Sequence, residues 1–302
     1  MKLTIGTRGS QLALWQANWV KDRLAAAGHD IAIQIIKTTG DKLPSLPLTQ
    51  SGTKGLFIKE IEEALLDGSV DLAVHSMKDL PTGQPAGLAV AAVPEREDAR
   101  DVLISADGKG FRQLDAGARL GTSSLRRRAQ LRNLRADLEL VPMRGNLDTR
   151  LRKLDRGDCE AMVLAAAGIH RLGWRERITE YFTCEQVCPA VGQGALGIES
   201  RADDDRVRQA VNVLDHAPTH HAVRAERALL RHLGGGCQVP IAAHAVTENG
   251  ELRLLGVVAD LAGKTVIRAQ ARRSADDPES LGAIVAEDLL RQGARAMLES
   301  IK

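Results

Sequence analysis

One cysteine, Cys237, lies in the segment LGGGCQVP directly after three consecutive glycines. Glycine adopts backbone angles that are closed to other residues and lets another molecule approach the main chain. Three glycines in a row also disfavour a core helix or strand. A buried structural cysteine is the alternative, because free cysteine usually acts as a small apolar residue. The glycine run favours a thiol in a loop, placed for chemistry or for covalent attachment.

Arginine is gathered in discrete clusters. Of the 41 basic residues 30 are arginine, whose planar fork binds a carboxylate or phosphate with two hydrogen bonds. The segment from Arg119 to Arg152 holds nine arginines, three acidic residues and no aromatic residue. Proteins that bind single-stranded nucleic acids combine basic grooves with stacking aromatic side chains, and the net charge of this chain is only +2. The pattern therefore favours a small ligand rich in carboxylate or phosphate over RNA or DNA.

Two of these clusters lie where a predicted strand passes into a predicted helix. Backbone N–H groups and the helix dipole favour an anion at a helix N-terminus. The alternative is an ordinary capped helix with a solvated arginine. Further along the second cluster, Arg144 lies in a predicted turn and Arg150 on the next predicted helix. The side chains at the two junctions are Arg8 and Ser10 in GTRGS, and Thr122, Ser123, Ser124, Arg126 and Arg127 in GTSSLRRR.

A carboxylate, Asp79, follows Lys78 in the segment DLAVHSMKDLP, just after a predicted strand. Loops after parallel strands often carry function in α/β folds. A carboxylate placed there can move protons or stabilise a developing cation. The alternative is a turn aspartate before Pro81. His75 is interpreted as a hydrogen-bonded residue at the end of the strand.

The remaining polar clusters predict no metal site. Cys184 and Cys188 lack a second Cys or His pair at zinc-binding spacing, and the pair His220 and His221 is interpreted as helix surface. Four cysteines are too few for a disulfide scaffold. We expect a cytoplasmic protein, because the N-terminus shows no apolar signal segment. No apolar run approaches the roughly 20 residues that span a membrane.

The candidate residues lie between segments that alternate between strand and helix patterns. Ser10 is expected to cap a helix that ends near Gly28, and 55–67 is expected to form an amphipathic helix with Glu60, Glu62 and Glu63 on its solvated face. Residues 38–53 are expected to form a loop. This alternation favours a mainly parallel sheet covered by helices. The predicted strands are 3–6, 31–36, 70–75 and 88–93.

The alternation begins again near Asp101, with strand patterns in VLIS, LELVPM and CEAMVLAAAG. Ser123 or Ser124 is expected to cap one helix, and Asn146 the next. The glycine-rich segment 186–200 is interpreted as a connector that returns to the first unit rather than as a core element. Helices are predicted at 203–215 and 217–233. Beyond Cys237 the pattern predicts a small α+β domain, with strands at 241–246, 252–260 and 264–273 and a helix at 280–300.

Taken together, the motifs resemble the porphobilinogen deaminase (hydroxymethylbilane synthase) family. The resemblance runs from about Leu3 to the end of the chain. It implies an α/β fold of two doubly wound, periplasmic-binding-protein-like domains, 1–96 with 195–214 and 97–194. It also implies a small α+β domain, 215–302, with an antiparallel three-stranded sheet. The motifs are RGSQLALWQ, GLFIKE, DLAVHSMKDLP, EREDARD, GTSSLRRRAQL, RGNLDTRL, LAAAGIHRLG, PAVGQGALGIE and GGGCQVP.

The resemblance implies a transferase of tetrapyrrole (haem) biosynthesis. Such an enzyme holds a dipyrromethane cofactor covalently through the cysteine that matches Cys237. It adds four porphobilinogen molecules head to tail with loss of ammonia, and water then releases hydroxymethylbilane. A cytoplasmic monomer is implied, with porphobilinogen as its substrate and with no nucleic-acid or membrane partner.

The resemblance also assigns roles to single residues. Asp79 is implied as the catalytic carboxylate, beside the azafulvene cation that loss of ammonia leaves. Arg128 is expected on the surface, and the loop 38–53 as a cover for the cleft. The implied cofactor-binding residues are Cys237, Lys78, Thr122, Ser123, Ser124, Arg126, Arg127 and Arg144. The implied substrate-binding residues are Arg8, Ser10, Arg150, Arg171, Lys54 and Phe57.

Two other functional classes compete with the transferase. One is a ligand-binding module of the periplasmic type without catalysis, which would need no thiol. The other is a nucleic-acid-binding protein, which near-zero net charge and scarce aromatic residues disfavour.

Overall fold

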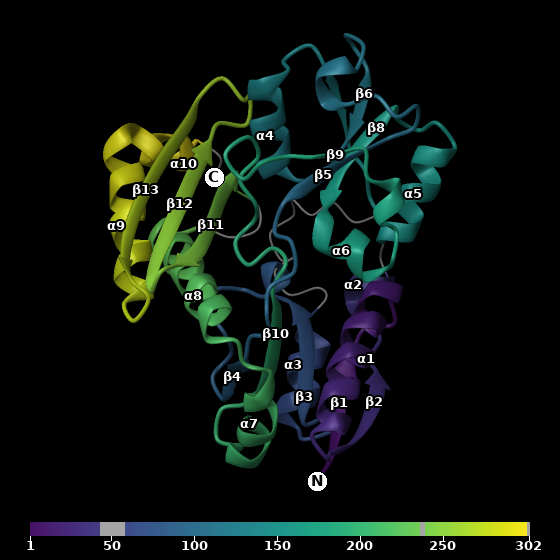
Figure 1. Cartoon of the computed structure of the whole chain (residues 1–302), viewed down its shortest axis with the longest axis vertical. Helices are drawn as coiled ribbons and strands as arrows, with labels where there is room; N and C mark the ends of the chain where they lie inside the picture. Colours follow the sequence, from purple (N-terminus) through teal and green to yellow (C-terminus); the bar gives the residue numbers. More distant parts are fainter. Residues whose placement is uncertain (43–57, 236–238, 301–302) are drawn as a thin grey trace. The chain divides into compact units, whose positions relative to one another are not determined.

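The computed structural model describes residues 1–42, 58–235 and 239–300, in two compact units. The first unit is Met1–Arg96 with Ala195–His220, and the second is Glu97–Gly194 with His221–Lys302. Figure 1 labels their helices and strands. The strands are β1 Lys2–Thr7, β2 Asp30–Ile35, β3 Leu72–Ser76, β4 Leu88–Ala92, β5 Asp101–Ser105, β6 Arg119–Gly121, β7 Glu139–Val141, β8 Ala161–Ala165, β9 Glu180–Tyr181, β10 Leu196–Arg201, β11 Ile241–Glu248, β12 Glu251–Ala259 and β13 Val266–Ser274. The longer helices are α1 Gln11–Ala26, α3 Lys59–Leu66, α4 Leu125–Leu134, α5 Leu147–Asp155, α7 Asp205–Val211, α8 Ala217–His232 and α9 Pro278–Leu289.

Short helices complete the described chain. They are α2 Thr39–Lys42, α6 Ala166–Arg171 and α10 Arg295–Glu299, with 3-10 turns η1 Met77–Asp79, η2 Phe111–Gln113, η3 Arg175–Arg177 and η4 Asn212–Leu214.

The sheet of the first unit has the strand order β2-β1-β3-β10-β4. Strand β1 is parallel to β2 and β3, and β10 runs antiparallel to both β3 and β4. Successive residues of a strand face opposite sides of the sheet. Leu72 and Val74 therefore pack with α1 and α7, while Ala73 packs with α3. The predicted mainly parallel sheet with helices on both faces is confirmed.

The second unit contains a sheet with the order β7-β6-β8-β5-β9. Strand β6 is parallel to β7 and β8, and β5 is antiparallel to β8 and β9. Leu103 and Leu131 belong to the apolar cluster that includes α4, whereas Ile104 and Leu151 belong to the cluster that includes α5 and α6. This sheet therefore repeats the architecture of the first one.

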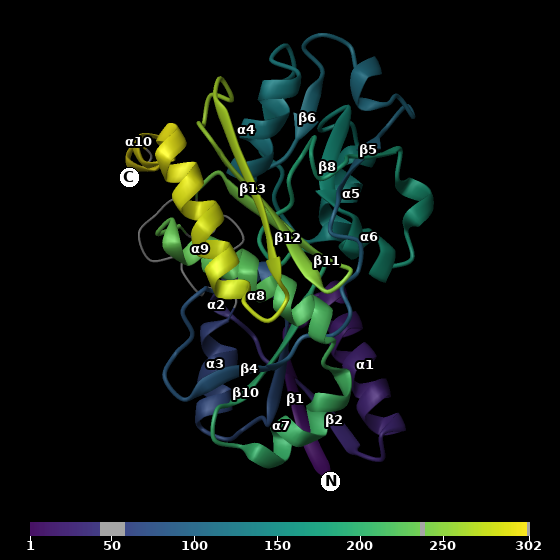
Figure 2. The same ribbon diagram turned by 60° about the vertical axis from the view of Figure 1, so that its left-hand side comes forward.

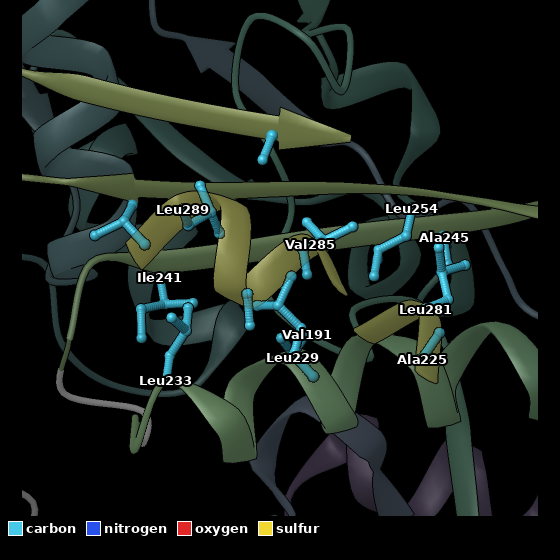
Figure 3. Packing of buried hydrophobic residues seen from close by; sticks show 14 of the residues in the cluster. Val191, Ala225, Leu229, Leu233, Ile241, Ala245, Leu254, Leu281, Val285 and Leu289 are labelled. Carbon is cyan, nitrogen blue, oxygen red and sulfur yellow. The ribbon is translucent and has the colours of Figure 1, made fainter. Parts of the chain in front are cut away.

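The second unit also contains the antiparallel sheet β11-β12-β13, which confirms the predicted C-terminal strands. Helix α9 runs along β12 and β13 (Figure 2). Figure 3 shows Leu229 of α8, Val285 and Leu289 of α9 and Leu254 of β12 in one apolar cluster. On the other face, Cys188 packs against the sheet in a separate small cluster.

Three expectations about local structure were wrong. The segment 186–200 contains most of β10, an inner strand between β3 and β4 whose Leu196 and Ile198 are buried, so it is more than a connector. Residues 39–42 form the helical turn α2 within the expected loop. The closing helix is interrupted by a π-helical turn, η5 Leu290–Ala294, because Gly293 has a φ of 103°.

The predicted fold class is confirmed by these three sheets. The further division of the second unit into two domains, at the predicted boundaries, stays a prediction. In the described part of the chain, no helix combines the length and the apolar character that crossing a membrane requires.

Candidate functional site

In the first unit, an open pocket of about 80 Å³ lies at the carboxyl ends of β1 and β3. Arg8 and Ser10 reach it from the β1–α1 junction, and Asp79 reaches it from the turn after β3. The same edge collects these residues because parallel strands end on the same side of a sheet. The structure therefore brings together three residues that lie up to 71 positions apart in the sequence.

Ser10 caps helix α1 as predicted. Its Oγ accepts a hydrogen bond of 3.3 Å from the Ala13 N–H. The N-terminus of α1 and the Arg8 guanidinium therefore contribute positive potential to one pocket. Arg8 is half-buried and Asp79 is exposed. The pocket can bind an anionic group at one side and stabilise a positive centre near the carboxylate of Asp79.

The turn that carries Asp79 is held by hydrogen bonds to two other elements. The Met77 N–H donates to the Ala195 carbonyl at 3.0 Å, just before β10. On the opposite side, Gln16 Nε2 of α1 donates to Ser76 Oγ at 3.0 Å. Gln16 and Ser76 both line the pocket. Asp79 thus has a fixed backbone position although its side chain reaches solvent, and Lys78 beside it is half-buried.

His75 forms one wall of the pocket and is hydrogen-bonded, as predicted. Its Nε2 lies 3.1 Å from Glu199 Oε2 of β10, and both side chains are buried. The predicted solvated face of α3 was wrong for two of its three glutamates. Glu60 accepts a hydrogen bond of 2.8 Å from the Thr39 N–H. Glu62 is partly buried, and this burial, with Glu199 nearby, raises its pKa although His75 lowers it; only Glu63 is exposed.

In the second unit, the β6–α4 junction carries the predicted hydroxyl cluster. Of the two candidate caps, Ser124 is the N-cap of α4, and its Oγ accepts a hydrogen bond of 3.4 Å from the Arg127 N–H. Ser123 Oγ donates to the Met143 carbonyl at 3.0 Å and accepts from the Met143 N–H at 2.9 Å. Thr122 is buried. The Ser123 hydroxyl therefore joins the segment after β6 to the segment after β7.

Arg126 and Arg127 are buried around one carboxylate, Asp101 at the start of β5. Arg126 Nη2 lies 2.8 Å from Asp101 Oδ2, and Arg127 Nη2 lies 2.8 Å from Asp101 Oδ1. Burial raises the pKa of Asp101, but the two arginines outweigh burial and hold that pKa far below its usual range. Burial lowers the pKa of Arg126, although the nearby Asp101 carboxylate opposes this effect. Among the described residues, the Nε atoms of both arginines have no hydrogen-bond partner.

Three further predicted arginines follow β7 and β8 in the sequence. Arg171 of α6 donates to the Gly194 carbonyl at 2.6 Å. Burial lowers its pKa to about 10, an effect that Glu97 opposes. Arg150 Nε donates to the Gly145 carbonyl at 2.8 Å, and the Arg144 carbonyl accepts from Lys153 Nζ at 3.2 Å. Half-buried Arg128 is less exposed than the predicted surface position.

Three predicted residues, Lys54, Phe57 and Cys237, lie outside the described part of the chain, as does most of the predicted cover 38–53. Of the other cysteines, Cys159 and Cys188 are buried, and burial raises the pKa of Cys159 to about 11. In residues 1–42, 58–235 and 239–300, no three His, Cys, Asp or Glu side chains converge in a way that could hold a metal ion.

Sequence reasoning missed Gln16, Ser76 and Asp101. Asp101 follows the charged segment EREDAR, where nothing distinguishes it from the surface acids around it. Gln16 lies four residues before Val20, on the buried face of α1. Apolar periodicity predicts that face, and a polar residue on it could have marked Gln16 as a candidate.

Comparison with known proteins agrees with the resemblance in the motifs. Residues 3–209 match the family domain described as "porphobilinogen deaminase, dipyrromethane cofactor binding domain", and residues 220–291 match "porphobilinogen deaminase, C-terminal domain". A porphobilinogen deaminase of Pelobacter propionicus is 52% identical over 302 residues, which cover 99% of this chain and 97% of the relative. One of Geotalea daltonii is 51% identical over 302 residues, covering 99% and 95%.

Among solved structures, an arginine-specific periplasmic binding protein of Salmonella typhimurium is 15% identical, with a TM-score of 0.40, over 70% of this chain and 91% of that one. The two family domains and the relatives that align over nearly their full length show which family this chain belongs to. The chain belongs to the porphobilinogen deaminase family.

Proposed function

We propose that this chain condenses four porphobilinogen molecules head to tail on a dipyrromethane cofactor and releases hydroxymethylbilane. One observation of the structure carries the proposal, namely the pocket that combines Arg8, the capped N-terminus of α1 and Asp79. Porphobilinogen carries two carboxylates and an aminomethyl group. A cationic side and a carboxylate in one pocket match a substrate that is anionic at its rim and becomes cationic at its reacting carbon.

In this proposal Arg8 and Ser10 bind a substrate carboxylate. Arg8 supplies a forked guanidinium, and the helix N-terminus supplies N–H groups. Binding there orients the aminomethyl carbon toward Asp79. When ammonia leaves with the electron pair of the C–N bond, Asp79 stabilises the cation that remains on the substrate. Hydrogen bonds to Ser76 and Met77 hold the start of the turn that carries Asp79 to the edge of the pocket.

The residues of the second unit fit a cofactor that carries several carboxylates. The β6–α4 junction offers hydroxyls and arginines, and the Nε atoms of Arg126 and Arg127 are buried donors with no protein partner in the described chain. When bound, the cofactor supplies the pyrrole to which the first substrate is joined. We propose Cys237 as its covalent anchor. Its proposed ligands are Lys78, Thr122, Ser123, Ser124, Arg126, Arg127 and Arg144. Arg150, Arg171, Lys54 and Phe57 are proposed to contact substrate rings.

The proposal includes the setting of the enzyme. We propose a cytoplasmic monomer of three domains, divided at the boundaries predicted from the sequence. No nucleic-acid or membrane partner is part of it.

The test is the intact mass of the purified chain under denaturing conditions, followed by a peptide map. We expect a surplus of two linked pyrroles on the peptide that contains Cys237, and none in Cys237→Ser. An unmodified chain that gains this mass on incubation with porphobilinogen also supports the proposal. A chain that never gains the mass, or that carries it on another residue, contradicts it.

A second measurement concerns the arginines. Arg127→Leu is expected to impair loading of the cofactor, because a buried guanidinium is lost. Arg128→Leu is the matched control, since it removes a neighbouring arginine to which no binding role is given. Equal loading in both variants would remove Arg127 from the proposed cofactor site.

A further inference from the structure

A row of ionisable side chains leads from the Asp79 pocket into the interior of the first unit. His75 of β3 lines the pocket, and its ring contacts Glu199 of β10 at 3.1 Å. The His75 side chain is 6% exposed and that of Glu199 is 0% exposed. Two interacting ionisable groups so deeply buried are costly to keep in a fold. Their position directly behind the pocket makes them candidates for a functional role.

Glu199 has two side-chain partners, and only one of them, His75, can carry a positive charge. One carboxylate oxygen faces His75, and the other accepts a hydrogen bond of 3.2 Å from Gln84 Nε2. Neither partner is a permanent cation. The charge of this pair therefore depends on whether the imidazole holds its second proton.

A second carboxylate, Glu62 of α3, belongs to the same cluster. Burial and Glu199 raise its pKa, and His75 lowers it, so the three groups influence one another. Within the described chain, Glu62 Oε1 is buried and has no hydrogen-bond partner. The charged groups around His75 are thus Glu199 of β10, in direct contact, and Glu62 of α3, which His75 influences electrostatically. Asp79 of η1 and Arg8 of the β1–α1 junction line the same pocket.

The proposed reaction needs a group of this kind. In each condensation the C–N bond of porphobilinogen breaks and its electron pair leaves with ammonia. The pyrrole carbon that forms the new C–C bond loses a proton, and the electrons of that C–H bond restore the aromatic ring. In the tautomer that places the Nε2 proton toward Glu199 Oε2, 3.1 Å away, Nδ1 of His75 has a lone pair that can accept this proton. The imidazolium then gives this proton to the amino group of the next porphobilinogen, which leaves that molecule as ammonia in the following condensation.

We propose that His75 is a second proton-exchanging residue of the Asp79 pocket, with Glu199 as the positioning residue that orients its ring. The inference rests on the proposed function, because it names the proton acceptor of that reaction. It separates two tasks, since Asp79 stabilises the cation and His75 takes up the proton.

The experiment measures ammonia release by the cofactor-loaded enzyme as a function of pH. His75→Gln is expected to lower kcat about 100-fold or more, the usual range for loss of an acid–base group, and to remove one limb of the pH profile, with KM little changed. The matched control is His220→Gln. It removes a similar pair, in which His220 Nδ1 lies 2.8 Å from Asp215 Oδ1 in the same unit, and His220 does not line the pocket.

A readout without turnover uses imidazole nitrogen NMR of the chain before loading. The two nitrogen shifts of His75 report which ring atom carries the proton, and Nε2 is expected to carry it in the wild type because Glu199 Oε2 lies 3.1 Å away. Glu199→Gln keeps a side chain of similar shape at that contact and is expected to weaken the preference for Nε2, so this arm stands if His75→Gln does not fold. A neutral His75 that carries its proton on Nδ1 overturns the proposal, and so does a wild-type pH profile in His75→Gln. A wild-type chain that releases no ammonia instead refutes the proposed function itself.

Discussion

The sheet of the first unit and the larger sheet of the second unit share one strand order, with an antiparallel strand in fourth place. Each of these two strands carries a fully buried carboxylate, Glu199 in β10 and Asp101 in β5. Asp101 is neutralised by two arginines, which keep their protons at any ordinary pH. Glu199 is paired with a histidine, which does not.

This difference separates two uses of one architecture. A carboxylate between permanent cations has a fixed charge and ties β5 to α4. A carboxylate beside an imidazole is paired with a group that can exchange a proton. The second arrangement lies behind the pocket with Asp79, and it is the one suited to moving protons.

The largest expected effect is on the stability of the second unit. Asp101→Asn leaves two buried guanidinium groups without a counter-charge, and breaking a buried ion pair in this way costs about 3–5 kcal/mol. Glu199→Gln is expected to cost less, because His75 can lose its proton. Urea unfolding of both variants measures the two free energies. Equal losses would show that the two carboxylates do not differ in the proposed way.

The same contrast predicts a pH dependence for Asp101. Because the arginines lower its pKa in the folded state, its contribution to stability is complete above its ordinary pKa of 3.8 and is lost as the pH falls below that value. The unfolding free energy of Asp101→Asn should therefore decrease less steeply in acid than that of the wild type.

The next effect is on catalysis at the first unit. Asp79→Asn is expected to lower kcat by about 100-fold to 1000-fold, the usual result of losing one electrostatic group at a transition state. The unfolding free energy should stay near that of the wild type, since the side chain is exposed. Ammonia release and urea unfolding test the two statements. Normal turnover in Asp79→Asn would remove Asp79 from the mechanism.

A smaller effect compares the two helix caps. Ser10→Ala and Ser124→Ala each remove one bond to a helix N–H, and such a loss costs about 1 kcal/mol. The two substitutions should therefore have similar costs in thermal or urea unfolding. A much larger cost for Ser124→Ala would indicate that Ser124 also orients Arg127.

The smallest effect concerns Glu62. Its pKa is raised in the folded state, so its contribution to stability is complete below its ordinary pKa of 4.5 and is lost as the pH rises through the folded value. Glu62→Gln should remove this loss and flatten the fall in unfolding free energy as the pH rises above 4.5. Glu63→Gln, an exposed neighbour on the same helix, is the control. The same slope in both variants would contradict the assigned burial of Glu62.

Local patterns were sufficient for much of the fold and for part of the site. The strand at Lys2–Thr7, the caps Ser10 and Ser124 and the three C-terminal strands follow from apolar periodicity and cap chemistry, which act over a few residues. The position of Asp79 just after a strand could also be predicted from the sequence, because its turn follows directly after β3.

Only the tertiary structure decided which polar residues are buried and what they contact. β10 reads as a glycine-rich connector, and it becomes a central strand because β3 and β4, more than 100 residues earlier, supply its hydrogen bonds. Asp101 and Glu62 look like surface acids. The fold brings Glu199, a second carboxylate that raises the pKa of Glu62, near Glu62. It also brings Arg127, from 26 residues away, to Asp101, whose charge Arg127 balances. Charge inside a protein is tolerated only where such a partner meets it, and that meeting is a property of the fold rather than of any local segment.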